Sequence, residues 1–266
     1  MVKNLKRRKM NIVICGFGRA GKAMAEKVLY SDKHNLLMVL CRKESQNAGK
    51  DIGEILIENN KVDFGVKIIP IDEAAETLKD QKVDVVIDFS KREMALPLID
   101  FCGKIGANLV LCTTNHTVEE ISLFRELSSS LGVGIVYAPN LTVGVNLLME
   151  FVKKVANVLA DFDFEIIEKH PKDKAKVTAT ARMISQSINR GDIPIHAVRM
   201  NGYVGVHQVI ATNGDERITV THESLARRAF ANGAILAADF IQGKKHFYLM
   251  KDVIKEIEEK ALKEQE

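Results

Sequence analysis

The stretch Asn11-Ile-Val-Ile-Cys-Gly16-Phe-Gly18-Arg-Ala-Gly21-Lys22 decides the fold that we expect for this chain. An apolar, β-branched run enters the pattern G-x-G-x-x-G, and a helix-forming segment follows. The first glycine permits a tight turn, the second lets the backbone approach a pyrophosphate, and the third allows close helix–strand packing. Because N–H groups at a helix start attract phosphate, we expect a dinucleotide site here, built from Gly16, Phe17, Gly18, Arg19, Ala20 and Gly21.

Outward from this turn, the first half of the chain alternates apolar strand-like runs with helical segments. The expected strands are 11–15, 36–41, 66–69, 83–88, 107–112 and 134–138, and helical patterns occupy 20–29, 91–105 and 117–131. Strands this apolar, alternating with helices, are typical of a parallel sheet covered on both faces. We therefore expect an α/β fold with a Rossmann-like, doubly wound parallel sheet.

After Pro139 the rhythm changes, and a second domain is expected. Helices are predicted over 143–159 and 178–187, around a strand at 162–167, and helices at 224–240 and 250–262 close the chain. Three strand-like runs at 196–201, 204–211 and 217–221 are separated by the turn signals Asn201-Gly202 and Asn213-Gly214, which predict consecutive hairpins. We expect an α+β domain with a mainly antiparallel or mixed sheet over residues 140–227. Residues 1–139 and 228–266 would form the dinucleotide-binding domain.

Composition restricts the partners of this chain. A net charge of +3 over 266 residues is too small to indicate nucleic-acid binding. No apolar run reaches the roughly 20 residues of a membrane span, and no apolar segment of the secretory type follows the basic start. The four cysteines fit no zinc pattern, so we expect no metal and read them as reduced thiols of a cytoplasmic protein.

The end of the second expected strand bears on cofactor choice. A carboxylate there would bind the free hydroxyls of an adenosine ribose, but the chain has Leu40-Cys41-Arg42-Lys43, and Glu44 follows only after the strand. Arg42 and Lys43 could pair with a 2′-phosphate, although they could also be solvated surface cations. NADPH is the cofactor we expect, with NADH use left open.

A third stretch, from Glu165 to Ala181, reads E-I-I-E-K-H-P-K-D-K-A-K-V-T-A-T-A and carries His170 and Lys174. A histidine and a lysine brought together can share proton transfer, because burial and neighbouring charge shift their pKa values toward neutrality. Lys174 could instead belong to the solvent face of an edge strand, since Lys172, Lys174 and Lys176 alternate.

This stretch resembles the signature of the dihydrodipicolinate reductase family, E-[IV]-x-E-x-H-H-x-x-K followed by D-A-P-S-G-T-A. Further resemblances occur at Ile87-Asp88-Phe89-Ser90, at Cys112-Thr113-Thr114 and over 138–146, each following an expected strand. Segments within 193–233 also match the family in order and spacing. The resemblance covers essentially residues 11–250.

The resemblance implies a function and further site residues. The family reduces a cyclic imine dicarboxylate in lysine (diaminopimelate) biosynthesis, with hydride from a nicotinamide. On that template His170 supplies the proton, Lys174 helps to bind the substrate, and residues 140–227 also form a homotetramer. It adds these residues to the cofactor site: Phe89, Cys112, Thr113, Thr114, Ala138, Asn140 and Leu141.

The chain departs from the family within the substrate loop. Pro171 replaces the second histidine, and Lys176-Val-Thr-Ala-Thr-Ala replaces D-A-P-S-G-T-A with one residue fewer. Thr180 keeps a hydroxyl, Ala179 can offer its N–H, and Thr178 could cap the helix, so an anion can still bind there. We expect Pro171, Lys174, Ala179 and Thr180 to contact the substrate. A related reductase of another cyclic imine, or an inactive dinucleotide-binding paralogue, remains an alternative.

Other polar residues of the second domain are less decisive. His207 and His222 fall in the expected sheet and could face the cleft, but we expect both to have packing roles. Arg199 and Arg227 match the family and could meet carboxylates, either of a substrate or in an ordinary buried ion pair.

Overall fold

The computed structural model describes residues 8–57, 62–174 and 177–264. By internal contacts the chain divides into two compact units, Met1–Pro139 with Phe230–Glu266, and Asn140–Ala229. Lys176 of the substrate loop and the basic residues before Arg8 lie outside the described ranges.

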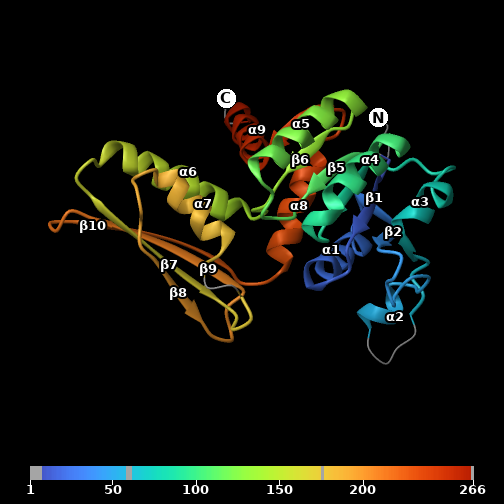
Figure 1. The fold of residues 1–266 in the computed structure, drawn as a ribbon, viewed down its shortest axis with the longest axis horizontal. Helices are drawn as coiled ribbons and strands as arrows, with labels where there is room; N and C mark the ends of the chain where they lie inside the picture. The colour runs from blue at the N-terminus through green and yellow to red at the C-terminus, as the bar shows by residue number, and fades with distance from the viewer. Residues whose placement is uncertain (1–7, 58–61, 175–176, 265–266) are drawn as a thin grey trace, which may run out of the picture. The chain divides into compact units, whose positions relative to one another are not determined.

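The first unit contains a seven-stranded sheet in the order β11-β6-β5-β4-β1-β2-β3, and every neighbouring pair is parallel (Figure 1). The strands are β1 (Met10–Cys15), β2 (His34–Cys41), β3 (Ile68–Pro70), β4 (Val85–Asp88), β5 (Asn108–Leu111), β6 (Ile135–Tyr137) and β11 (Phe247–Leu249). The helices are α1 (Arg19–Leu29), α2 (Gly53–Leu56), α3 (Ile71–Thr77), η1 (Arg92–Met94), α4 (Ala95–Ile105), α5 (Val118–Leu131), α8 (Arg228–Phe240) and α9 (Met250–Lys263). The predicted Rossmann-like parallel sheet is confirmed.

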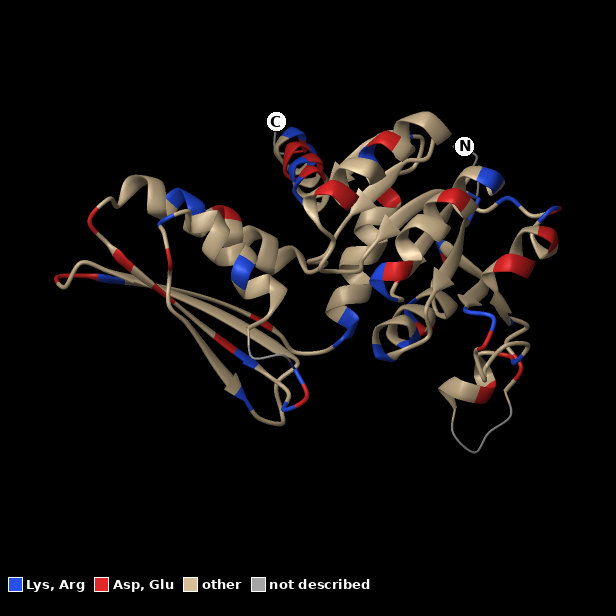
Figure 2. Ribbon diagram, viewed as in Figure 1, with Lys and Arg blue, Asp and Glu red and all other residues tan. Residues whose placement is uncertain are grey.

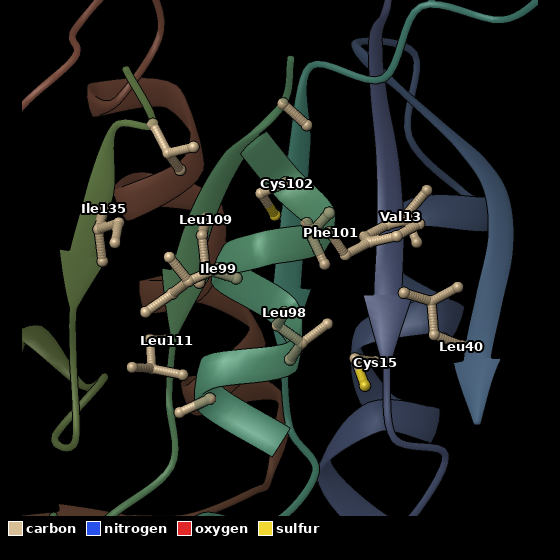
Figure 3. Packing of buried hydrophobic residues seen from close by; sticks show 14 of the residues in the cluster. Val13, Cys15, Leu40, Leu98, Ile99, Phe101, Cys102, Leu109, Leu111 and Ile135 are labelled. Atoms are coloured by element: carbon tan, nitrogen blue, oxygen red, sulfur yellow. The ribbon is translucent and has the colours of Figure 1, made fainter. Parts of the chain in front are cut away.

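Apolar side chains from strands and helices form the core of this sheet. Leu98 and Ile99 of α4 are fully buried, in one cluster with Val13 of β1 and Leu109 of β5 (Figure 3). Charged residues are frequent on helices such as α9, whereas β1 and β5 contain none (Figure 2). A sheet apolar on both faces fixes the strand ends firmly, and the loops that follow β1, β2 and β4 therefore have a rigid base.

The second unit is a four-stranded mixed sheet in the order β10-β9-β7-β8. Its strands are β7 (Asp163–His170), β8 (Ile195–Arg199), β9 (Gly205–Thr212) and β10 (Arg217–Ser224), and its helices are α6 (Val143–Val158) and α7 (Ala179–Ile188). Figure 1 shows α6 and α7 side by side, and both contribute to one apolar cluster with the sheet. The mixed α+β domain is confirmed.

The predicted hairpin between 196–201 and 204–211 is wrong. β8 pairs in parallel with β7, and β9 pairs antiparallel with the other side of β7. Since α7 connects β7 to β8 as a crossover, the chain returns in the same direction and β8 becomes an edge strand. The Asn213-Gly214 turn does close a hairpin, between β9 and β10.

Strand β7 delivers the functional side chains of this unit. Side chains alternate between the faces of a strand, and along β7 the buried positions are Phe164, Ile166, Glu168 and His170. Phe164 and Ile166 belong to the apolar cluster with α6 and α7. The same face therefore changes from apolar to ionisable residues as the strand reaches its carboxyl end.

Candidate functional site

The turn after β1 requires glycine at two positions, because a Cβ atom there would overlap neighbouring backbone. Gly16 has φ +88°, and a Cβ on it would lie 2.8 Å from the backbone of Phe89. A Cβ on Gly21 would lie 2.0 Å from the carbonyl oxygen of Gly16, so the helix packs directly on the turn. Gly18 differs, because it has an ordinary extended conformation and a Cβ on it would meet no atom of the described chain within 4 Å. The absence of a side chain at Gly18 therefore leaves open space in front of the turn, where a pyrophosphate would approach the backbone.

A cavity of about 350 Å³ opens beside this turn, which is the size of a small-molecule site. Four of the predicted cofactor residues besides Gly16 lie in or around its wall: Phe17, Gly18, Arg42 and Phe89. The strand ends β1, β2 and β4 supply most of the lining. The full set is Cys15, Gly16, Phe17, Gly18, Leu40, Cys41, Arg42, Ser45, Asn47, Ile68, Phe89, Ser90, Lys91 and Met94.

Other predicted cofactor residues are placed elsewhere. Arg19 and Ala20 begin α1 next to the cavity but do not line it. Lys43 is exposed, and its Nζ lies 3.9 Å from a carboxylate oxygen of Asp72. Residues that follow β5 and β6 are also absent from the lining: Cys112, Thr113, Thr114 and Ala138. Asn140 and Leu141 belong to the second unit.

Asp88 ties two of these loops together at the end of β4. Its buried carboxylate accepts hydrogen bonds from the Ser90 N–H (2.9 Å) and from the Thr113 hydroxyl (3.2 Å). Burial raises the pKa of Asp88 to about 6, although the hydrogen bonds from Ser90 and Thr113 oppose the shift. Thr113 thus has a structural contact at the cavity edge even though it does not line the cavity.

A second ionisable cluster lies in the other unit and centres on Glu168. Its carboxylate is fully buried and pairs with the Arg199 guanidinium through Oε1. The Thr178 hydroxyl donates to Oε2 (2.5 Å), and the Thr178 N–H reaches the same carboxylate at 3.2 Å. A buried charge is costly unless it is paired and hydrogen-bonded, and Glu168 meets both conditions. Of the two arginine alternatives, the buried ion pair is the one seen for Arg199.

Two histidines complete this cluster. The Nε2 atoms of His170 and His207 are 3.3 Å apart, and both side chains are buried. A Cβ at position 205 would lie 2.9 Å from Cε1 of His170, so Gly205 leaves room for the ring. Burial lowers the pKa of His170, opposed by the Glu168 carboxylate, and burial together with the other cations lowers that of His207 to about 3. His207, predicted to pack only, also contacts the predicted acid.

The start of α7 brings two other predicted residues together. Thr178 caps the helix by accepting a hydrogen bond from the Ala181 N–H (3.2 Å), as the sequence predicts. The Thr180 hydroxyl donates to the Asn140 side-chain carbonyl at 2.6 Å. The first bond within the helix runs from Arg182 to Thr178, so the N–H groups of Ala179 and Thr180 precede it and point out of the helix start. Such N–H groups suit a carboxylate.

Lys174 lies in a turn, not in an edge strand. Its N–H donates to the Pro171 carbonyl (3.1 Å), and β7 ends at His170. The Lys174 carbonyl accepts a hydrogen bond from Nε of Arg199 at 3.2 Å. Arg199 therefore connects the buried Glu168 to the backbone of the exposed Lys174. Because Lys174 lies beyond the end of β7, the alternative that it belongs to the solvent face of an edge strand is wrong.

The sequence argument did not identify Glu168, Thr178 and Arg199 as one cluster with His170. Glu168 stands inside the E-x-x-E-x-H segment, on the same strand face as His170, and that spacing is the signal for it. No local signal connects it to Arg199, which lies 31 residues away.

A parallel sheet with a glycine turn at the end of its first strand is the arrangement of the dinucleotide-binding domain of oxidoreductases. Family models agree. Residues 10–141 match "Dihydrodipicolinate reductase, N-terminus", and residues 144–254 match "Dihydrodipicolinate reductase, C-terminus". The chain belongs to the dihydrodipicolinate reductase family.

Named relatives match most of the chain. A 4-hydroxy-tetrahydrodipicolinate reductase of Methanopyrus kandleri is 32% identical and covers 91% of this chain and 95% of its own length. The enzyme of the same name from Thermosipho africanus is 34% identical, over 77% of this chain and 94% of its own. Among solved structures, a dipicolinate-bound dihydrodipicolinate reductase from Paenisporosarcina sp. TG-14 has a TM-score of 0.72 at 23% identity, covering 91% of this chain and 98% of that one, which supports the fold.

In the described part of the chain, no helix has the length and apolar character needed to cross a membrane.

Proposed function

We propose that this protein reduces 4-hydroxy-tetrahydrodipicolinate, through 2,3-dihydrodipicolinate, to tetrahydrodipicolinate in lysine biosynthesis. The observation that carries the proposal is the buried His170 at the end of β7, just before the expected substrate loop, in a chain that belongs to this family. The names of the relatives support the substrate, a small cyclic imine with two carboxylates.

The first unit is proposed to hold the cofactor. The residues fit a dinucleotide, because Gly18 leaves open space at the cavity and the N–H groups of α1 begin there. When bound, the nicotinamide supplies a hydride. Arg42 lines the cavity at the end of β2, where a 2′-phosphate would sit, and this supports NADPH as the preferred cofactor over NADH.

His170 is proposed to donate the proton from its ring. Burial disfavours the imidazolium and makes it a stronger acid, while Glu168, with Oε2 3.8 Å from Nε2 of His170, keeps protonation accessible. His207 contacts the same nitrogen and can share its proton. This geometry supports His170 as the acid, because His207 could return a proton to the ring after each turnover.

The second unit is proposed to bind the substrate carboxylates. Lys174 is exposed next to the cluster and carries a cation, while the N–H groups of Ala179 and Thr180 open α7. Pro171 fixes the turn that follows His170, since its carbonyl accepts the Lys174 N–H. The Thr180 hydroxyl already donates to Asn140, so a carboxylate here would rely on backbone N–H groups unless that bond is exchanged. This favours a related imine carboxylate as the second candidate.

Assembly and location complete the proposal. A homotetramer built through the second unit, and residence in the cytoplasm, are what the family resemblance and the free cysteines support. Sedimentation analysis at several protein concentrations tests the tetramer, and a stable monomer would contradict it.

The direct test follows NADPH absorbance while dihydrodipicolinate synthase generates the unstable substrate in the same cuvette. We expect oxidation that depends on both enzymes, with tetrahydrodipicolinate as the product. If NADPH binds but is not oxidised with this substrate, the altered loop serves another cyclic imine, and a panel of imine carboxylates would identify it. Failure with the whole panel would leave a dinucleotide-binding paralogue without turnover.

A further inference from the structure

Three atoms that commonly bind metal ions converge inside the second unit. Nε2 of His170 and Nε2 of His207 are 3.3 Å apart, and each lies 3.8 Å from Oε2 of Glu168. The three residues are 7%, 5% and 0% exposed, respectively. Across residues 8–57, 62–174 and 177–264, this is the one group of three or more histidine, cysteine or acidic side chains whose ligand atoms come this close together.

The triangle formed by these atoms has the size of a zinc site. The point in the plane of these three atoms that is equidistant from them is about 2.1 Å from each, within the roughly 2.0–2.2 Å of zinc–nitrogen and zinc–oxygen bonds, and the atoms would close slightly around an ion that also binds a fourth ligand. Two histidines and one glutamate, with a fourth position left for water, are also the donor set of many zinc enzymes. The side chains need no large movement to accept an ion.

Each donor has an electron pair to give. Arg199 engages Oε1 of Glu168, while Oε2 accepts the Thr178 hydroxyl with one electron pair and lies 3.8 Å from Nε2 of each histidine. The His170 ring also hydrogen-bonds the backbone of Val204, an outer contact of the kind that orients metal-binding histidines.

We propose that Glu168, His170 and His207 form a binding site for a borderline divalent cation of the Zn²⁺ class, including Co²⁺ and Ni²⁺. Imidazole ligands select these ions over Mg²⁺ and Ca²⁺, which prefer oxygen. The positive charges of Arg199 and Lys174 lie close enough to affect both histidines, and they weaken cation binding. The site is therefore reversible and not a structural zinc centre.

Occupancy has a functional consequence that rests on the proposed function. An ion on Nε2 of His170 would occupy the nitrogen that we assign to proton transfer, so Zn²⁺ would inhibit the reductase. The cysteine spacing, which led us to expect no metal, carries no information about this site, because its two histidines are 37 residues apart and come from β7 and β9.

The test uses the full-length protein and Co²⁺, whose visible absorption is intense only in tetrahedral or similar low-coordinate sites. We expect one Co²⁺ per chain with such a spectrum, displaced by Zn²⁺ and removed by a chelator. A second measurement adds Zn²⁺ to the coupled reductase assay, where turnover should fall and recover on chelation. A wild-type protein that binds no Co²⁺ overturns the proposal without any variant.

Variants locate the ion. His207→Gln should weaken Co²⁺ binding at least about tenfold, and His207→Asn serves if the first variant does not fold. The matched control is His196→Gln, which removes a histidine of the same sheet whose Nε2 is 3.2 Å from Glu165 on the exposed surface, and it should leave Co²⁺ binding unchanged. Equal affinity in wild type and His207→Gln overturns the site. Binding without inhibition upholds the site and counts against His170 as the acid.

Discussion

The Nε2 atoms of His170 and His207 lie 3.3 Å apart within the second unit, close enough to share one proton. Glu168 faces both rings, while Arg199, Lys174 and His222 add positive or potentially positive charge around them. Under the proposed function, this contact would supply a proton to the acid His170. It also gives the cluster a measurable dependence on pH.

The buried pair should make stability depend on pH. The pKa of His207 falls to about 3 on folding, so below its unfolded pKa of about 6.5 the unfolded chain binds more protons than the folded one. The stability that this group contributes is complete above pH 6.5 and is lost as the pH falls toward 3. Between pH 7 and pH 5, we expect wild type to lose about 2 kcal/mol more of its unfolding free energy than His207→Gln. Urea unfolding at both pH values measures it, and parallel losses would contradict it.

Catalysis should have its own pH limb. Because burial lowers the pKa of His170, the protonated acid declines as the pH rises, and kcat/KM should fall above an apparent pKa below 6.5. Glu168 opposes this shift, so Glu168→Gln should move the limb to still lower pH. A profile that rises with pH over the same range would exclude His170 as the group whose protonated form is needed.

Substituting alanine for two glycines of the cofactor turn should affect different properties, namely cofactor affinity at Gly18 and stability at Gly21. Gly18→Ala adds a methyl group where no described atom lies within 4 Å, so stability should change by less than about 0.5 kcal/mol while cofactor affinity falls. Gly21→Ala places Cβ 2.0 Å from the Gly16 carbonyl oxygen and should destabilise the fold by about 1–3 kcal/mol. Thermal unfolding and cofactor titration of both variants check this. Unaltered cofactor binding in Gly18→Ala would remove the turn from the site.

Arg42 and Lys43 are neighbours with different surroundings, and this makes them a matched pair. Arg42 lines the cavity, while Lys43 is exposed beside Asp72. Arg42→Ala should weaken NADPH binding about tenfold more than NADH binding, because only NADPH offers a 2′-phosphate. Lys43→Ala should show little selectivity. If Arg42→Ala affects both cofactors equally, the 2′-phosphate site lies elsewhere.

The sequence predicted the first unit more completely than the second. Strands such as Val85–Asp88 are continuous apolar runs, which is how a doubly covered parallel strand appears. Strand Phe247–Leu249 escaped prediction because three residues form no pattern, and only pairing with β6 makes them a strand. In the second unit, Asn201-Gly202 indicated a hairpin, yet the crossover through α7 decided the strand order.

In the candidate site, too, features set by neighbouring residues in the sequence could be predicted, whereas contacts between distant segments could not. The glycine turn and the position of His170 follow from contiguous residues, so the sequence alone indicated both. The contacts of His170 and Glu168 with His207 depend on strand register, which places Glu168 opposite His207 in the β7–β9 pair. Sequence patterns do not specify such pairing between distant strands.

One measurement tests the central claim most directly, which is the turnover of His170→Gln compared with wild type. NADPH oxidation is followed with synthase-generated substrate, and NADPH affinity is measured separately for each protein. We expect turnover to fall at least about a hundredfold with unchanged NADPH affinity, while His196→Gln keeps wild-type turnover. Turnover of His170→Gln equal to that of wild type would contradict the assignment of His170 as the proton donor.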